Sequence, residues 1–189
     1  MDGNLAYQED RREELIDGKI VAMAPASTGH VYLSGSILSI FMHYLKGRNC
    51  IPFGDGLLVY LTGKDKFVPD MMVVCDRDKI KPDGVHGAPD LVVEVLSPST
   101  AKNDKGYKKN VYESSGVPEY WIVDPLQRSI EVYLLQDGRY IIDNIYTLYT
   151  AEKLAKMTDD EKAVVATELK CHLYDDLIIR LEDIFSDFF

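Results

Sequence analysis

The amino-acid sequence predicts a mixed α/β fold (α+β) in which a central mixed β-sheet is flanked by helices, with hairpins near both ends. The chain has 189 residues, of which 46% are hydrophobic, enough for one well-packed domain and few for two. Stretches typical of strands alternate with stretches of helical periodicity. Residues 89–96 (PDLVVEVL) are apolar almost throughout, which indicates a central strand covered on both faces. We therefore predict a single domain spanning residues 1–189.

Turn and cap residues define the elements of the first half. Asp17-Gly18 accepts positive φ and favours a tight hairpin turn. Ser27 offers an N-cap oxygen, and Gly47 is placed to end a helix whose apolar residues recur at helical spacing. In chain order, the sequence predicts a hairpin at 14–24, a helix between Ser27 and Gly47, and strands at 54–60, 67–75 and 89–96.

The second half contains the clearest hairpin. Asp137-Gly138 lies between two apolar runs and predicts a tight turn. Residues 101–115 have apolar and charged pairs at i, i+4, with Gly116 just past the end, which favours a helix. The remaining predictions are strands at 119–123, 129–135 and 139–145, a charged helix-prone segment at 151–165, short strands at 169–173 and 177–179, and a helical turn at 181–185.

The charge of the chain limits its modes of nucleic-acid binding. The formal net charge is -10 and the sequence pI is near 4.8. Because phosphate affinity comes from Lys and Arg that displace counterions, this charge argues against a protein that coats nucleic acid with its whole surface. Residues 151–189 hold ten acidic and five basic side chains, whereas Lys102–Lys109 holds four lysines against one aspartate. We expect a polyanion to bind at the lysine-rich segment.

The cysteines and the N-terminus point to a reducing, cytoplasmic location. Cys50, Cys75 and Cys171 are far apart, odd in number and form no CxxC pair, so the sequence predicts neither a disulfide framework nor a zinc site. The first fifteen residues are acidic and polar, unlike a signal peptide. The most apolar helical stretch, 37–45, is too short to cross a bilayer, and we expect no membrane partner.

Two carboxylates are the strongest candidates for chemistry. Hydrolysis of a phosphodiester at neutral pH needs a divalent ion, and hard ions such as magnesium are held by carboxylates and carbonyls. Glu94 lies inside the apolar strand LVVEVL, where a carboxylate is costly unless it is paired, protonated or bound to a metal. Asp70 follows Pro69, 24 residues earlier. The structural alternatives are that Glu94 faces a solvated groove or pairs with a lysine, and that Pro69-Asp70 is a turn.

The third part of such a site is a cation that orients water or stabilises the leaving group. In the simplest arrangement this lysine comes two residues after the acid, but Leu96 occupies that position. The helix at 101–115 offers Lys105, Lys108 and Lys109 instead. Lys108 is one helical turn beyond Asp104, and the alternative account is an ordinary surface ion pair between the two.

Several short segments of the sequence resemble the Uma2 family, also known as DUF820, a bacterial group of restriction-endonuclease-like proteins. The resemblance extends over nearly the whole chain and keeps the order of its phrases. The phrases are Glu14 to Gly18 (ELIDG), His30 in the following helix, Pro69-Asp70, Glu94 to Ser99 (EVLSPS), Asp104 with Lys108 and Tyr112, Gly116 to Pro125 (GVPEYWIVDP) and the closing LYDDLIIRLEDIF.

This resemblance implies the PD-(D/E)XK nuclease fold, with magnesium or manganese held by acids at Asp70 and Glu94. The strand lysine is absent from the family's pattern, and Lys108 on the helix is the proposed substitute. Glu14 and His30 match recurrent family positions. His30 could act as a proton carrier or as the partner of a metal ligand, although a histidine at a helix start is more often packed or exposed. The resemblance also implies a homodimer, and residues 151–165 resemble an insertion in a surface loop.

The predicted function is a metal-dependent endonuclease that acts on DNA. Asp70, Glu94 and the carbonyl of Val95 are predicted to hold one Mg2+ or Mn2+, while Lys108 positions the attacking water. An alternative is a catalytically inactive nuclease-fold module that binds or regulates nucleic acid or mobile elements, which the acidic composition favours. A third is a phosphohydrolase of small nucleotides. The sequence has no Walker loop, GxGxxG, HExxH or GxSxG, so the enzyme classes built on them lack their minimal residues.

Overall fold

The computed structural model describes residues 12–186 and places a six-stranded mixed sheet at its centre. The strand order is β12-β11-β10-β9-β6-β3. β9 pairs in parallel with β10 and antiparallel with β6, so it is central as predicted. The strands are β3 (Ile51–Gly54), β6 (Met71–Val74), β9 (Leu91–Val95), β10 (Glu119–Asp124), β11 (Ser129–Gln136) and β12 (Arg139–Thr147).

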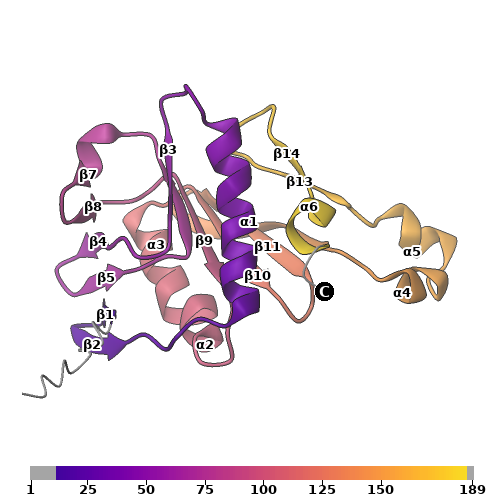
Figure 1. Cartoon of the computed structure of the whole chain (residues 1–189), viewed down its shortest axis with the longest axis horizontal. Helices are drawn as coiled ribbons and strands as arrows, with labels where there is room; N and C mark the ends of the chain where they lie inside the picture. Colours follow the sequence, from indigo (N-terminus) through magenta and orange to yellow (C-terminus); the bar gives the residue numbers. More distant parts are fainter. Residues whose placement is uncertain (1–11, 187–189) are drawn as a thin grey trace, which may run out of the picture.

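Helices cover both faces of this sheet, α1 in front and α3 behind (Figure 1). α1 (Thr28–Tyr44) packs with Val93 and Trp121 in one core, together with the C-terminal α6 (Leu181–Phe185). α3 (Lys109–Ser115) belongs to a second core with Val92 and Tyr120. Since successive strand residues point to opposite faces, Glu94 shares the face of Val92 and is directed toward α3.

A second six-stranded sheet flanks the first, with strand order β2-β1-β5-β4-β8-β7. Its strands are β1 (Glu13–Ile16), β2 (Lys19–Ala22), β4 (Val59–Thr62), β5 (Asp65–Phe67), β7 (Ile80–Lys81) and β8 (Gly84–His86), with the short helix η1 (Arg77–Lys79) before β7. The predicted hairpin at 14–24 is β1 and β2, and Asp17 and Gly18 have φ values of 50° and 73°. Asp137 (49°) and Gly138 (76°) make the same turn between β11 and β12, so both hairpin predictions are confirmed.

The bounds of two predicted strands are wrong, because each prediction spans parts of two strands in the structure. Residues 54–60 are the end of β3, a turn and the start of β4. Residues 67–75 divide at Val68-Pro69-Asp70, so that β5 joins the second sheet and β6 the central one. The reason is that proline donates no backbone hydrogen bond and interrupts the ladder, although the apolar pattern continues on both sides of it.

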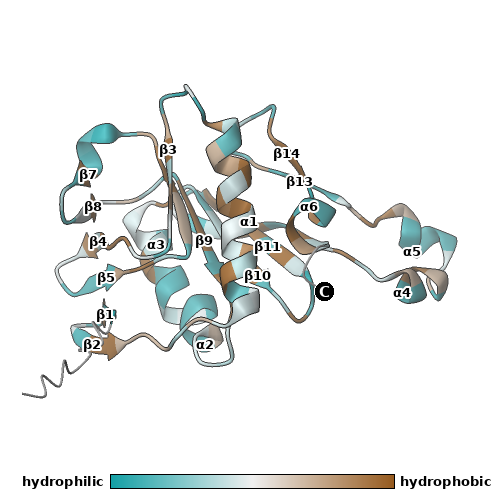
Figure 2. Ribbon diagram, viewed as in Figure 1, coloured by the Kyte–Doolittle hydropathy of each residue, from teal (hydrophilic) through white to brown (hydrophobic). Residues whose placement is uncertain are grey.

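The predicted helix at 101–115 is present but contains an irregular turn. It consists of α2 (Ala101–Asn103), the π-helical turn η2 (Asp104–Lys108) and α3, and it ends at Gly116 with φ of 87°. Figure 2 shows that α2 and the turn after it are largely hydrophilic. Even so, Asp104 and Lys108 are buried, at 1% and 4% exposure.

The charged segment at 151–165 forms two short helices rather than one. These are α4 (Ala151–Ala155) and α5 (Asp159–Ala163), and they project from the sheet as an arm (Figure 1). The break falls at Thr158, which forms a capping box with Glu161 and so starts a new helix. The chain returns through β13 (Glu168–Lys170) and β14 (Ile178–Arg180), which form a two-stranded sheet as predicted.

The prediction that the cysteines form no disulfide is wrong. Cys50 and Cys75 are joined, and only Cys171 among the three is free. They precede β3 and follow β6, whose antiparallel pairing brings Ile51 opposite Val74. The sequence could not predict this disulfide, because the two cysteines are 25 positions apart and meet only through the pairing of β3 with β6. No helix among residues 12–186 is long and apolar enough to cross a membrane.

Candidate active site

Asp70 lies where the chain crosses from β5 to β6, at 6% exposure. Its Oδ2 atom accepts a hydrogen bond from the amide of Val95 at 2.6 Å, which fixes the carboxylate beside the end of β9. Its Oδ1 atom lies 2.7 Å from Nε2 of His30 in the first turn of α1. Hydrogen bonding to Asp70 raises the pKa of His30, and partial burial opposes this only in part. The structure thus joins Asp70, His30 and Val95 in one group.

Glu94 lies within β9 at 3% exposure. Its Oε1 atom accepts from the hydroxyl of Tyr112 at 2.9 Å and from Nζ of Lys108 at 3.4 Å. Burial raises the pKa of Glu94 well above its usual value, although the charge of Lys108 lowers it. The predicted alternative in which Glu94 faces a solvated groove is therefore wrong, and its lysine partner comes from the helix.

Lys108 lies among three carboxylates with its side chain 5% exposed. Its Nζ is near Glu14 Oε1 at 2.7 Å, Glu94 Oε1 at 3.4 Å and Asp104 Oδ1 at 3.5 Å. Burial alone lowers the pKa of this lysine, but the three negative charges outweigh burial and raise the pKa above its usual value. Lys108 is therefore an ammonium group that donates hydrogen bonds and cannot act as a base at neutral pH.

The other two helix lysines point elsewhere. Nζ of Lys105 pairs with Glu131 at 2.6 Å, with 43% of the lysine side chain exposed. Nζ of Lys109 lies over the ring of Tyr133, 3.6 Å from its centre. Of the three candidates, the structure brings Lys108 to Glu94. The alternative that Asp104 and Lys108 form a surface pair is wrong, because both are buried.

Glu14, on β1, reaches the same group from the second sheet. Its Oε1 accepts from the amide of Val68 at 2.9 Å and also contacts Lys108. The predicted residues Glu14, His30, Asp70, Glu94, Val95 and Lys108 are thus brought together by β1, α1, β9, η2 and the segment before β6.

Two members of this group were missed as site residues by sequence reasoning. Asp104 is buried beside Lys108, and Tyr112 donates to Glu94. The positions 104, 108 and 112 lie at i, i+4 and i+8 on one helical face, and this spacing was the available signal.

The donor chemistry of the group fits a hard divalent cation. Magnesium is commonly held by one or two protein carboxylates plus water and substrate oxygens, and Asp70 and Glu94 supply two. Oδ1 of Asp104 is buried and, within residues 12–186, accepts no hydrogen bond. Among the same residues, no three His, Cys, Asp or Glu side chains are arranged to hold an ion by themselves. The fit is therefore to an ion that keeps other ligands.

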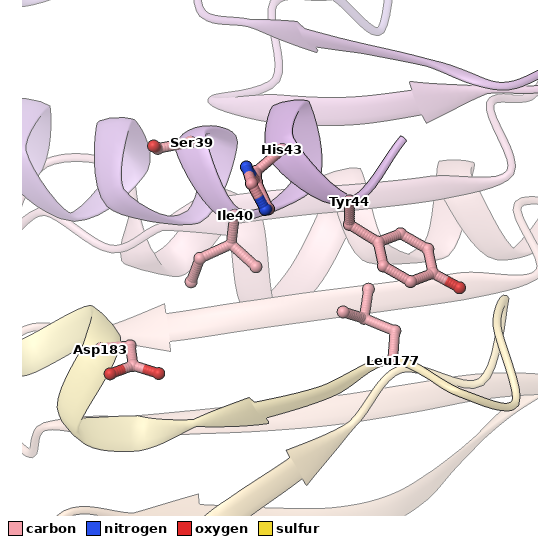
Figure 3. Close-up of a pocket in the computed structure, with 6 residues that line it drawn as sticks. All are labelled: Ser39, Ile40, His43, Tyr44, Leu177 and Asp183. Carbon is pink, nitrogen blue, oxygen red and sulfur yellow. The ribbon is translucent and has the colours of Figure 1, made fainter. Parts of the chain in front are cut away.

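A separate hollow of about 430 Å³ lies between α1 and the C-terminal segment, where His43, Tyr44 and Asp183 surround it (Figure 3). Its other lining residues are Ser39, Ile40 and Leu177. None of the predicted site residues lines it.

The central mixed sheet thus carries one acid before β6, a second acid within the adjacent β9 and a lysine against that second acid. The fold of the chain is similar to that of a crystal structure of a "putative nuclease belonging to DUF820" from Anabaena variabilis. It matches with a TM-score of 0.69 at 20% identity, over 92% of this chain and 89% of that one.

The chain belongs to the Uma2 family, described as "putative restriction endonuclease", whose match covers residues 4–158. Two uncharacterized proteins of Synechocystis sp. are also similar. The first is 32% identical over 145 residues, which is 74% of this chain and 76% of the relative. The second is 27% identical over 130 residues, which is 67% of this chain and 73% of the relative. Fold and family are thus those of nuclease-like proteins.

Proposed function

We propose that this protein is a Mg2+- or Mn2+-dependent endonuclease that hydrolyses phosphodiester bonds of DNA, with its site lysine on the helix after β9. The observation that carries the proposal is the buried group of ionisable side chains around Asp70 and Glu94. Four carboxylates in it, those of Glu14, Asp70, Glu94 and Asp104, are at most 7% exposed. They face two basic groups, Lys108 and His30.

The charge of this group supports a divalent partner. With all six side chains ionised, four negative charges meet two positive ones, which leaves the charge that one divalent cation neutralises. Uncompensated charge is expensive in a buried site, where a group takes a proton or a counterion instead. Burial raises the pKa of Glu94, so the buried carboxylate favours either a proton or a cation. An ion at Glu94 would supply the cation.

Each residue has a distinct part in the proposed reaction. Asp70, Glu94 and the carbonyl of Val95 would hold Mg2+ or Mn2+, which when bound activates water and neutralises phosphate charge. Tyr112 orients the Glu94 carboxylate through its hydroxyl. The ammonium of Lys108 donates a hydrogen bond to the water or to a phosphate oxygen, and Glu14 holds that ammonium in place. His30, whose Nε2 contacts Asp70, would move a proton in the proposed reaction.

Replacement of Glu94 tests this assignment. Glu94→Ala is expected to abolish Mg2+- and Mn2+-dependent cleavage of plasmid and linear DNA, since it removes a metal ligand from the proposed site. Glu168→Ala, at an exposed position on β13, is the matched control and should cut like the unaltered protein. Equal cleavage by Glu94→Ala and the unaltered protein would show that the site is wrongly assigned.

A second candidate is a nuclease-fold module that binds or regulates without cutting, and the net charge of -10 favours it. Calorimetry separates the two functions. Heat of Mn2+ or Mg2+ binding at millimolar ion supports the enzyme, and its absence supports the module. A homodimer stays a prediction, which light scattering of the purified chain would test.

A further inference from the structure

Asp104 differs from the other buried aspartate of comparable exposure in its hydrogen bonds. Asp65 is 1% exposed, and its carboxylate accepts from the amide of Asp17 and from two hydroxyls, those of Thr62 and Tyr107. Asp104 is also 1% exposed, yet its Oδ1 accepts no hydrogen bond from the described residues. Buried polar atoms that make no hydrogen bond are rare, and an ion or water is a common explanation for them.

The position of Asp104 is fixed from outside the helix. The hydroxyl of Tyr120, on β10, donates to the Asp104 carbonyl at 3.0 Å. This bond anchors η2, a π-helical turn, a type of irregularity that is frequent at functional sites. The backbone of Asp104 is therefore anchored to β10, and its side chain is buried.

This oxygen, which pairs electrostatically with Lys108 but accepts no hydrogen bond from the described residues, lies next to the proposed metal ligand Glu94. Asp104 Oδ1 is 3.5 Å from Nζ of Lys108, and Glu94 Oε1 is 3.4 Å from the same nitrogen. Both oxygens are thus arranged around one ammonium group. An ion held at Glu94 would have Asp104 as a neighbour.

We infer that Asp104 is an outer carboxylate of the cation site, which accepts a hydrogen bond from the hydration shell of the ion held by Asp70 and Glu94. The inference rests on the proposed function. An outer place is favoured over direct ligation because no three acidic or histidine side chains among residues 12–186 are arranged to hold an ion. Magnesium also keeps several waters, and these need acceptors.

Titration of Mn2+ into the full chain, followed by calorimetry and by the spin-resonance signal of free Mn2+, tests this role. Asp104→Asn keeps the shape of the side chain and removes its charge. Loss of an outer-shell partner weakens metal affinity by about 10- to 100-fold, which is the expected result. Asp65→Asn, a buried aspartate with hydrogen-bonded oxygens outside this group, should bind Mn2+ like the unaltered protein.

Thermal unfolding in EDTA separates this role from a purely structural one. Without metal, Asp104→Asn removes one of several crowded negative charges while Lys108 keeps Glu14 and Glu94 as partners, so its Tm should equal or exceed that of the unaltered protein. The rise of Tm on adding Mn2+ should shrink. A lower Tm in EDTA would assign Asp104 a structural role and overturn the inference. Unchanged Mn2+ affinity in Asp104→Asn would overturn it and leave the proposed function intact. If the unaltered protein bound no Mn2+, both would fail.

Discussion

Replacing Lys108 by methionine should strongly destabilise the protein, even without metal or substrate. The change keeps the apolar stem of the side chain and removes a charge that contacts three carboxylates, the nearest at 2.7 Å. Removing one partner of a buried ion pair costs about 3–5 kcal/mol, because the other partner stays buried and uncompensated. For a chain of this length, that cost lowers Tm by roughly 6–20 °C.

The measurement is thermal unfolding in EDTA at pH 8, followed by circular dichroism. Lys105→Met is the matched control, because Lys105 is on the same helix but its pair with Glu131 is near the surface, where such pairs contribute about 0–1 kcal/mol. The cost of Lys108→Met should also shrink at pH 5, since Glu94 and Asp104, whose pKa values are raised by burial, can then take protons. Equal Tm values for the two variants at pH 8 would refute the buried ion group as described.

Two further predictions concern pH and the disulfide. Because burial raises the pKa of Glu94 above 4.5 and hydrogen bonding to Asp70 raises that of His30 above 6.5, the stability they contribute is fully present below those ordinary values. It is lost as pH rises through the folded-state pKa values, so Tm in EDTA should fall as pH rises above 4.5, and Glu94→Gln should flatten the first part of that decline. A decline of equal slope in Glu94→Gln would contradict the assignment. Reduction of Cys50–Cys75, which are 25 positions apart, should cost about 3 kcal/mol of stability, and thiol titration of the unfolded, unreduced chain should detect Cys171 alone. Detection of all three cysteines would rule out the disulfide.

The parts of the fold that the sequence predicts well depend on short-range chemistry. Asp17-Gly18 and Asp137-Gly138 need positive φ at both positions, so the turns follow from the residues alone. Ser27 caps α1 by accepting from the amide of His30, three residues away. β9 is apolar on both faces, which requires cover on both sides. These features need no knowledge of distant residues.

The errors arise where distant contacts decide the outcome. An Asp–Lys pair at i, i+4 has the same sequence pattern on a surface and in a core. Here Asp104 and Lys108 are buried because Glu14 arrives from another sheet and Glu94 from β9. Likewise, the sequence shows no register for β3 and β6, and therefore no reason to pair Cys50 with Cys75. Glu94 could be named because a carboxylate in an apolar strand is costly wherever that strand lies, whereas Asp70 was named from the Pro69-Asp70 pair and the family resemblance.

The acidic composition of the chain has little electrostatic effect at the proposed site. Residues 151–189 hold ten acidic and five basic side chains, and the arm formed by α4 and α5 extends from the side of the sheet opposite β1 and β2 (Figure 1). Exposed charges are largely screened beyond about 8–10 Å at physiological salt. The carboxylates of the site are buried, and Lys108 and His30 already compensate part of their charge. A phosphate near the site would therefore be affected mainly by the local charges of that group and by the nearby exposed Lys102 and Lys105. For this reason the net charge of -10 is only a weak argument for an inactive module.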